Sequence, residues 1–192
     1  REALLRTHSA LADVKLAYLL KDICLDAWST HPASAVGAAA SLRTLAIVSP
    51  LPEITALEAW GVGLKAVVDG QMEHALDALQ DAQARFLDLG QPRTAAETQV
   101  SRLVALAMLG RYEEAISCGL AARDLFLSFA DDLAVGKIEH NIGNIYFRRD
   151  QYEEAEKFQS SARERFILAN DPDQLTKIEN SLALTLSLRY EI

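Results

Sequence analysis

An internal repeat of 40 residues is the feature that most constrains how this chain can fold. Alanine recurs at this interval at Ala35, Ala75, Ala115 and Ala155, and a whole run of residues recurs with it: Tyr112-Glu113-Glu114-Ala115 returns as Tyr152-Glu153-Glu154-Ala155. Three later alanines and three phenylalanines keep the same spacing: Ala82, Ala122, Ala162, Phe86, Phe126 and Phe166. A period of about 20 to 50 residues is typical of a stacked array, in which each unit buries its apolar face against the next. The sequence therefore predicts an array and not a single globular core.

Glycine and proline indicate where the helices of this array end and begin. Glycine is favoured just past the last turn of a helix and proline in the first turn. The positions that fit these roles recur with the period: Gly70, Gly110 and Asp150 for the ends, and Pro52, Pro92, Asp132 and Pro172 for the starts. No alternation typical of strands occurs. The expected helices span residues 13–28, 32–48, 52–68, 72–89, 93–109, 112–129, 133–149, 152–169 and 172–188.

One stretch of the chain resembles a known helical repeat. Residues 141–155 resemble a tetratricopeptide repeat, with the family's apolar, small, aromatic, turn, tyrosine and alanine positions filled by Ile142, Gly143, Tyr146, Asp150, Tyr152 and Ala155. Asp150 departs from the family's glycine. Residues 108–115 match the same pattern in its turn and second helix. Repeats of 40 residues are longer than the family's usual ones, and they resemble arrays of bacterial signalling proteins, including those that precede CHAT (caspase-like) protease domains.

The resemblance implies an all-α fold, a right-handed superhelical solenoid of antiparallel helix hairpins. We expect about four hairpins plus a final helix in a single array over residues 1–192. Its repeats span about 9–50, 51–90, 91–130 and 131–170, with a final half-repeat at 171–192. Small residues at Gly63, Gly143 and Ala183 suit the points where the helices of a hairpin cross, and Leu103 is the exception. The repeat would need a further helix after Tyr190, so we expect self-association through the uncapped final helix.

Charge and composition narrow the range of partners. The chain has 192 residues and a net charge of −8, from 27 acidic and 19 basic residues. Nucleic-acid binding depends on lysine and arginine contacts to phosphates, so nucleic acid is an unfavourable partner. No apolar run approaches the ~18 residues needed to cross a bilayer, so no membrane partner is expected either. The two cysteines, Cys24 and Cys118, form no disulfide framework, which favours a reducing, cytoplasmic location.

No pattern of catalytic or metal-binding residues stands out. His8, His31, His74 and His140 are scattered without a second ligand at metal-binding spacing. The paired acids Glu113-Glu114 and Glu153-Glu154 lie early in a helix, where they favour the helix dipole. We therefore expect no enzyme activity, no metal and no cofactor.

The family resemblance implies that the first helix of each hairpin lines a concave groove that holds a peptide. The groove-facing offsets correspond to Leu57, Trp60, Leu64, Val100, Val104, Met108, Lys137, His140, Asn141, Asn144, Arg148 and Asn180. The same offsets add Lys177 and Leu184 in the final helix. This groove is apolar in its N-terminal half and basic and polar in its C-terminal half. The alternative for the apolar half is that a missing domain, residues 1–10 or a second copy of the chain covers it.

The expected function is a non-catalytic protein–protein interaction scaffold or regulatory module that binds a peptide or partner segment in this groove. Two alternatives stay open. One is a peptide-sensing regulatory array of a transcription or signalling protein. The other is the non-catalytic portion of a CHAT-type protease.

Overall fold

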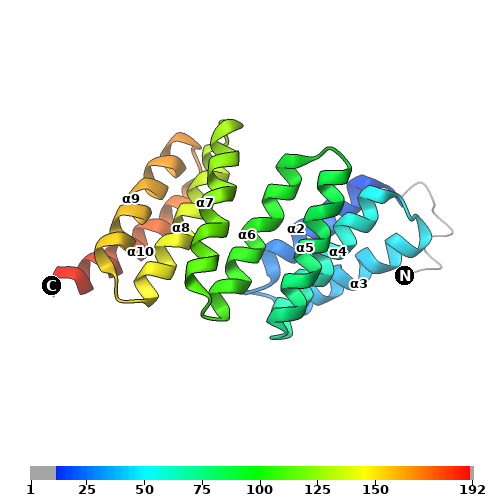
Figure 1. Ribbon diagram of the computed structural model, residues 1–192, viewed down its shortest axis with the longest axis horizontal. Helices are drawn as coiled ribbons and strands as arrows, with labels where there is room; N and C mark the ends of the chain where they lie inside the picture. Colours follow the sequence, from blue (N-terminus) through cyan, green and yellow to red (C-terminus); the bar gives the residue numbers. More distant parts are fainter. Residues whose placement is uncertain (1–11, 191–192) are drawn as a thin grey trace. The chain divides into compact units, whose positions relative to one another are not determined.

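The computed structural model describes residues 12–190, and within this range the chain is helical with no strand (Figure 1). Between residues 12 and 190, nine α-helices follow one another. Their bounds are α2 Val14–Ala27, α3 Pro32–Val48, α4 Pro52–Val68, α5 Met72–Asp88, α6 Pro92–Met108, α7 Tyr112–Ser128, α8 Asp132–Arg148, α9 Tyr152–Leu168 and α10 Pro172–Tyr190. The all-α expectation is confirmed, and each predicted helix lies within two residues of an observed one.

The turns between these helices share one backbone conformation. From α4 onward the second residue of each turn has a positive φ, between 52° and 75°: Gly70, Gly90, Gly110, Ala130, Asp150 and Asn170. The next residue donates its N–H back into the preceding helix, as Gln71 does to the carbonyl of Ala66 at 2.8 Å. This arrangement is the Schellman motif, which satisfies carbonyls at the helix end. The sequence prediction named only every second one of these turns.

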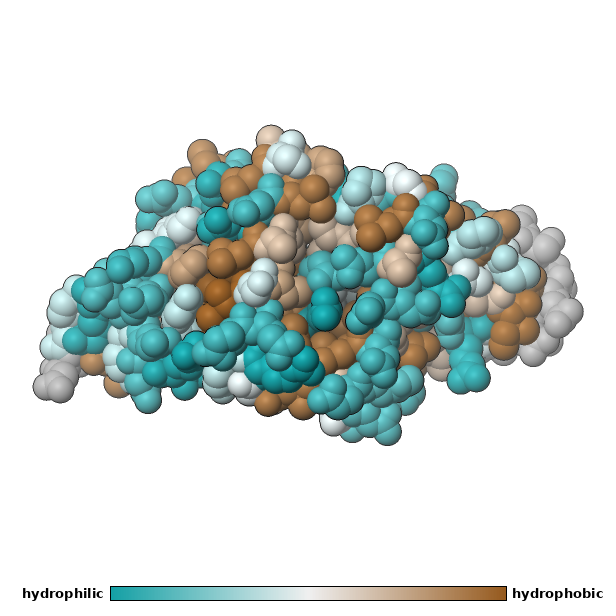
Figure 2. All heavy atoms as spheres, viewed as in Figure 1, coloured by the Kyte–Doolittle hydropathy of each residue, from teal (hydrophilic) through white to brown (hydrophobic). Residues whose placement is uncertain are grey.

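The chain divides into two compact units. Unit 1 is Arg1–Ala105 and unit 2 is Leu106–Ile192. On the face drawn in Figure 2, hydrophobic and hydrophilic residues are interspersed. Such mixing is usual for folded proteins, because polar groups are too few to cover the whole surface. Whether residues 1–192 form one continuous array stays a prediction.

The core of unit 1 lies where α2 and α3 pack on α4 and α4 packs on α5. Helix α2 contacts both α3 and α4. Trp60 of α4 and Phe86 of α5 are at most 1% exposed. Their rings meet edge to face, with centroids 6.1 Å apart. Gly63 lies at the α4–α5 crossing, and a Cβ atom there would come within 2.7 Å of Leu79 Cγ. The small residue predicted at this crossing is therefore needed for close packing.

Unit 2 is organised around the α8–α9 hairpin, with α7 packed on α8 and α10 packed on α9. Phe166 of α9 is fully buried. It lies against Gly136, where a Cβ atom would come within 2.7 Å of the ring. Gly143 lies at the crossing with Gln159, 2.8 Å from Cγ by the same measure. Ala115 and Ala155, which keep the period, are 0% exposed. The period thus selects small residues for close contacts between helices.

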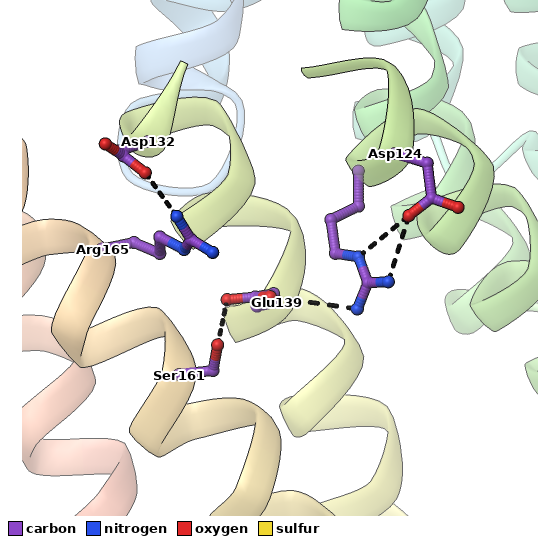
Figure 3. A network of polar contacts seen from close by, with 6 residues as sticks. Asp124, Asp132, Glu139, Ser161 and Arg165 are labelled. Atoms are coloured by element: carbon purple, nitrogen blue, oxygen red, sulfur yellow. Dashed lines mark hydrogen bonds and ion pairs between the residues drawn. The ribbon is translucent and has the colours of Figure 1, made fainter. Parts of the chain in front are cut away.

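A buried carboxylate joins α7, α8 and α9 (Figure 3). Glu139 of α8 is only 5% exposed. It accepts a hydrogen bond from the Ser161 hydroxyl at 2.8 Å, and its other oxygen lies 3.9 Å from the Arg123 guanidinium. A second pair, Arg165 with Asp132 at 2.6 Å, joins α9 to the start of α8. These contacts satisfy polar groups between helices and leave them unavailable to a partner.

Candidate partner-binding face

The three apolar residues assigned to the N-terminal half of the groove are buried in the core of unit 1. Leu57, Trp60 and Leu64 are 0%, 1% and 4% exposed. They belong to the core cluster that includes α2 residues Ala17 and Cys24. The expectation that these three side chains line an open groove is therefore wrong, because the chain's own helices cover them. Residues 1–10, one of the covers considered, lie outside the described residues.

Polar side chains around Trp60, which we call the polar layer, help to hold α2 against α4. They are Lys21, Asp22 and Ser101. The Lys21 ammonium of α2 lies 4.9 Å from the centroid of the Trp60 ring and 2.5 Å from Asp22. The Trp60 indole N–H donates to the Ser101 hydroxyl at 3.1 Å. A lysine above an aromatic face gains cation–π attraction while its stem adds apolar contact. Lys21 is consequently buried, which its charge alone did not indicate.

The hydroxyl of Tyr18 ties the same layer to α4. It donates to Glu53 at 2.9 Å, and the side-chain amide of Gln91 donates to the same carboxylate oxygen at 3.0 Å. Burial, followed by the hydrogen bond and charge of Glu53, raises the pKa of Tyr18 to about 12. Tyr18 therefore stays protonated and keeps donating at any physiological pH. This layer is a structural link between helices.

The residues assigned from α6 are partly accessible. Val100 and Val104 are half-buried in unit 1. Met108, which ends α6 and belongs to unit 2, is 45% exposed.

The polar residues assigned to the C-terminal half lie together on unit 2. Lys137, His140, Asn141, Asn144 and Arg148 follow one another at helical spacing along a single stripe of α8. The neighbouring helix α10 adds Lys177, Asn180 and Ser181. We call these eight residues the polar face. None of the eight is buried, and Lys137, Arg148, Lys177 and Asn180 are exposed. All of them except Ser181 were assigned to the groove from the sequence, and the structure leaves them at least partly accessible.

One hydrogen bond joins the two stripes of the polar face. His140 Nε2 and Ser181 Oγ lie 3.0 Å apart. Burial, followed by the charge of Lys177, lowers the pKa of His140. Its imidazole is therefore neutral at neutral pH and adds no positive charge to the face. The sequence analysis did not identify Ser181 as the partner of His140. The repeat offered a signal, because Ser181 lies 40 residues after Asn141 and so has the same groove-facing offset.

The polar face concentrates the unpaired cations of unit 2. Lys137, Arg148 and Lys177 make no ion pair with any described residue. Every other lysine or arginine between residues 106 and 190 has a carboxylate partner within 4 Å: Arg111, Arg123, Arg149, Lys157, Arg163, Arg165 and Arg189. Unpaired cations next to asparagine amides can bind carboxylates and backbone groups of another molecule.

The fold is an all-α array of helices, packed in tandem on their neighbours. Residues 94–167, from α6 to α9, match the Tetratricopeptide repeat family. Together with the nine consecutive helices of the described part of the chain, this match supports a repeat array of the tetratricopeptide type. Arrays of this type are in general protein–protein interaction scaffolds. No curated protein matches the chain. Between residues 12 and 190, no helix has the length and apolarity that crossing a membrane requires.

Proposed function

We propose that the polar face of unit 2 binds an acidic segment of a partner protein, so that the chain acts as a scaffold or regulatory module. The observation that carries this proposal is the gathering of three unpaired cations on one face of a unit in which all other described cations are paired. Unsatisfied charge of one sign on a protein of net charge −8 supports a partner of the opposite sign.

Each residue of the face has a distinct part in this proposal. The planar guanidinium of Arg148 can hold a carboxylate through two parallel hydrogen bonds, whereas Lys137 and Lys177 act as point charges. Asn141 and Asn144 can donate to and accept from the backbone of an extended segment. Leu184, which is 53% exposed on α10, offers an apolar contact beside them. The preferred segment therefore combines acidic residues with an apolar anchor.

A peptide array tests this proposal directly. Short synthetic peptides that vary in their number of aspartate, glutamate and leucine residues are immobilised and probed with the whole chain. The chain should bind most strongly to peptides that hold both acids and leucine, and less as salt rises. The double variant Asn144→Ala with Arg148→Ala should lose at least about tenfold in affinity, since hydrogen bonds to charged groups are worth roughly 1.5–3 kcal/mol.

A matched control separates this site from net charge. Lys157→Ala with Ser160→Ala, both on α9, also removes one cation and one polar group. This control should bind like the unmodified chain while both variants keep their helical circular dichroism. Equal loss in the two double variants would refute the assignment of the site and leave only a general charge effect.

The wider setting of the chain is proposed from the repeat length and the cysteines. The length of the repeats supports a place in a bacterial signalling protein, as a peptide-sensing array or as the non-catalytic portion of a CHAT-type protease. A cytoplasmic location is supported by Cys24 and Cys118, neither of which forms a disulfide within the described residues. Self-association through α10 is also proposed.

A further inference from the structure

Unit 1 contains a pocket that is separate from the polar face. It has a volume of about 240 Å³ and lies between α3, α4 and the start of α5. Arg43, Lys65 and His74 line it, each from a different helix. The remaining wall is formed in part by Ala39, Ala40 and Ala66. A pocket of this size suits a ligand smaller than a typical drug molecule.

Two residues that line the pocket differ from their counterparts in the later repeats. Ala40 stands at the register position that Gln80, Leu120 and Ser160 occupy in the later repeats. Ala66 stands at the position of Leu106, Tyr146 and Leu186. Position 40 of the first repeat and position 66 of the second both carry alanine where the later repeats have larger side chains, and these two alanines leave space for the hollow. Architecture does not require these alanines, since the other repeats fold without them.

Two basic residues that line the pocket also differ from their counterparts in the later repeats. Lys65 replaces the uncharged Ala105, Ile145 and Thr185. His74 replaces the acids Glu114 and Glu154 in the first turn of the second helix. The acid normally found at this point is therefore missing where the pocket opens. Both changes make this region less acidic than its counterparts.

The negative charge beside the pocket is already engaged. Asp69, the carboxylate that lines the pocket, forms an ion pair with Lys65. Glu58, which faces Arg43, also faces Arg85 and does not line the pocket. Arg43 is exposed and makes no ion pair within 4 Å to any described residue. Its guanidinium is therefore available to an anion.

We propose that this pocket binds a small oxyanion, either a phosphate or a carboxylate. Arg43 supplies a planar pair of donors, which matches the oxygens of both groups. Lys65 and His74 add donors from α4 and α5, and the three alanines leave the space that the ligand fills. This proposal concerns unit 1 alone and is independent of the proposed partner face.

Calorimetric titration of the whole chain with inorganic phosphate, and separately with succinate, tests this site. Sodium chloride at matched ionic strength is the reference for non-specific screening. We expect saturable binding of phosphate, succinate or both, and the comparison identifies the preferred anion. Arg43→Gln should weaken binding at least tenfold. Ala40→Gln, which introduces the residue of the next repeat, should weaken it equally by filling the pocket.

Lys15→Gln is the charge-matched control, because Lys15 is exposed on α2 and does not line the pocket. It should bind like the unmodified chain. Heat from phosphate and succinate that matches the chloride reference would overturn the proposal. Binding that survives both Arg43→Gln and Ala40→Gln would also overturn it, because the anion would then lie elsewhere.

Discussion

Ala130 has a backbone conformation that alanine tolerates poorly. Its φ is 53°, in the left-handed region that glycine adopts without a steric penalty. The equivalent turns at 70, 90 and 110 carry glycine. We predict that Ala130→Gly stabilises the protein by about 1 kcal/mol, because it relieves the contact between Cβ and the backbone. A urea titration followed by circular dichroism measures the change as a shift of the unfolding midpoint.

The reverse substitution at a matched turn is the control. Gly110 has a φ of 74°, and a Cβ atom added there meets no described heavy atom within 4 Å. Gly110→Ala should therefore destabilise the protein through backbone strain alone, by about 1 kcal/mol. If both substitutions shift the midpoint in the same direction, the turn at Ala130 is not left-handed.

The pKa of His140 links the polar face to the pH dependence of stability. Burial and then Lys177 lower this pKa below its ordinary value of 6.5. In the window between the lowered value and 6.5 the unfolded chain binds more protons than the folded one, so stability increases with pH there. We predict that acidification through this window destabilises the protein, and that His140→Gln reduces this pH dependence. Thermal unfolding of both proteins across the window checks the prediction, and equal slopes would contradict it.

At the scale of single helices, most of the fold could be predicted from the sequence. The predicted bounds 32–48 and 52–68 are those of α3 and α4. Proline in the first turn and glycine just past the last turn determine where a helix begins and ends. The periodic positions of these residues were therefore sufficient to predict the helix bounds. The burial of Leu57 and Trp60 depends instead on α2, which lies more than 30 residues away and breaks the pattern. The sequence alone could not show that Lys21 would cover an aromatic ring instead of pointing into water.

The exposure of the polar residues on α8 and α10 was predicted better than that of the apolar residues on α4, for a physical reason. Lysine, asparagine and arginine along one stripe of a helix remain near water in almost any packing, because burying them unpaired is costly. Leucine and tryptophan are equally compatible with a groove and with a core. The oxyanion pocket was missed because alanines that leave a space resemble alanines that allow close packing.

The crossing of α4 and α5 depends on the glycine at position 63. Its Cβ position lies 2.7 Å from Leu79 Cγ, which is fully buried. We predict that Gly63→Ala destabilises unit 1 by about 1–3 kcal/mol through overpacking, reduced by the better helix propensity of alanine. The double variant with Leu79→Ala should be less destabilised than the sum of the two single ones. Additive losses in a double-mutant cycle would show that the two residues are not in contact.

The carboxylate of Glu139 makes α7, α8 and α9 interdependent. Arg123→Met removes the only cation found within 4 Å of this buried group among the described residues. We predict a loss of about 1–3 kcal/mol, because an uncompensated buried charge is left behind. Adding Glu139→Gln should recover part of the loss, since a neutral amide needs no cation and can still accept from Ser161. Urea titrations of the three variants test this, and no recovery in the double variant would contradict the charge explanation.

At the scale of the whole molecule, the repeat and its departures have different roles. Residues that keep the period, such as Ala115, Ala155 and Phe166, are buried and hold helices together. The proposed functions rest on residues that break it. Lys137 and Arg148 depart from the apolar Leu57 and Val68 at the same offsets, and Ala40 and His74 depart from larger or acidic residues. Comparing residues at the same offset in different repeats therefore separates those that hold the helices together from those that are candidates for binding.

The outer face of α10 is a second departure at this scale. Thr176, Glu179 and Ala183 of α10 are exposed, and α10 packs on α9 and α8. Their counterparts on α8, 40 residues earlier, are buried: Gly136, Glu139 and Gly143. On α8 those positions face a following helix, so on α10 they present a surface shaped for one. A second copy of α10 can fill it, and Tyr190, further along the same stripe, extends the surface with exposed area.

We therefore predict that this chain self-associates as its concentration rises, through pairing of α10 with α10 of a second copy. Ala183→Glu should shift the chain toward the monomer, because it places like charges opposite each other at the closest approach of the two helices. Ala84→Glu, at an exposed position of α5 in unit 1, is the matched control and should leave association unchanged. Static light scattering over a concentration series measures the average mass. A chain that stays monomeric at the highest concentration, or that responds equally to both substitutions, would refute this interface.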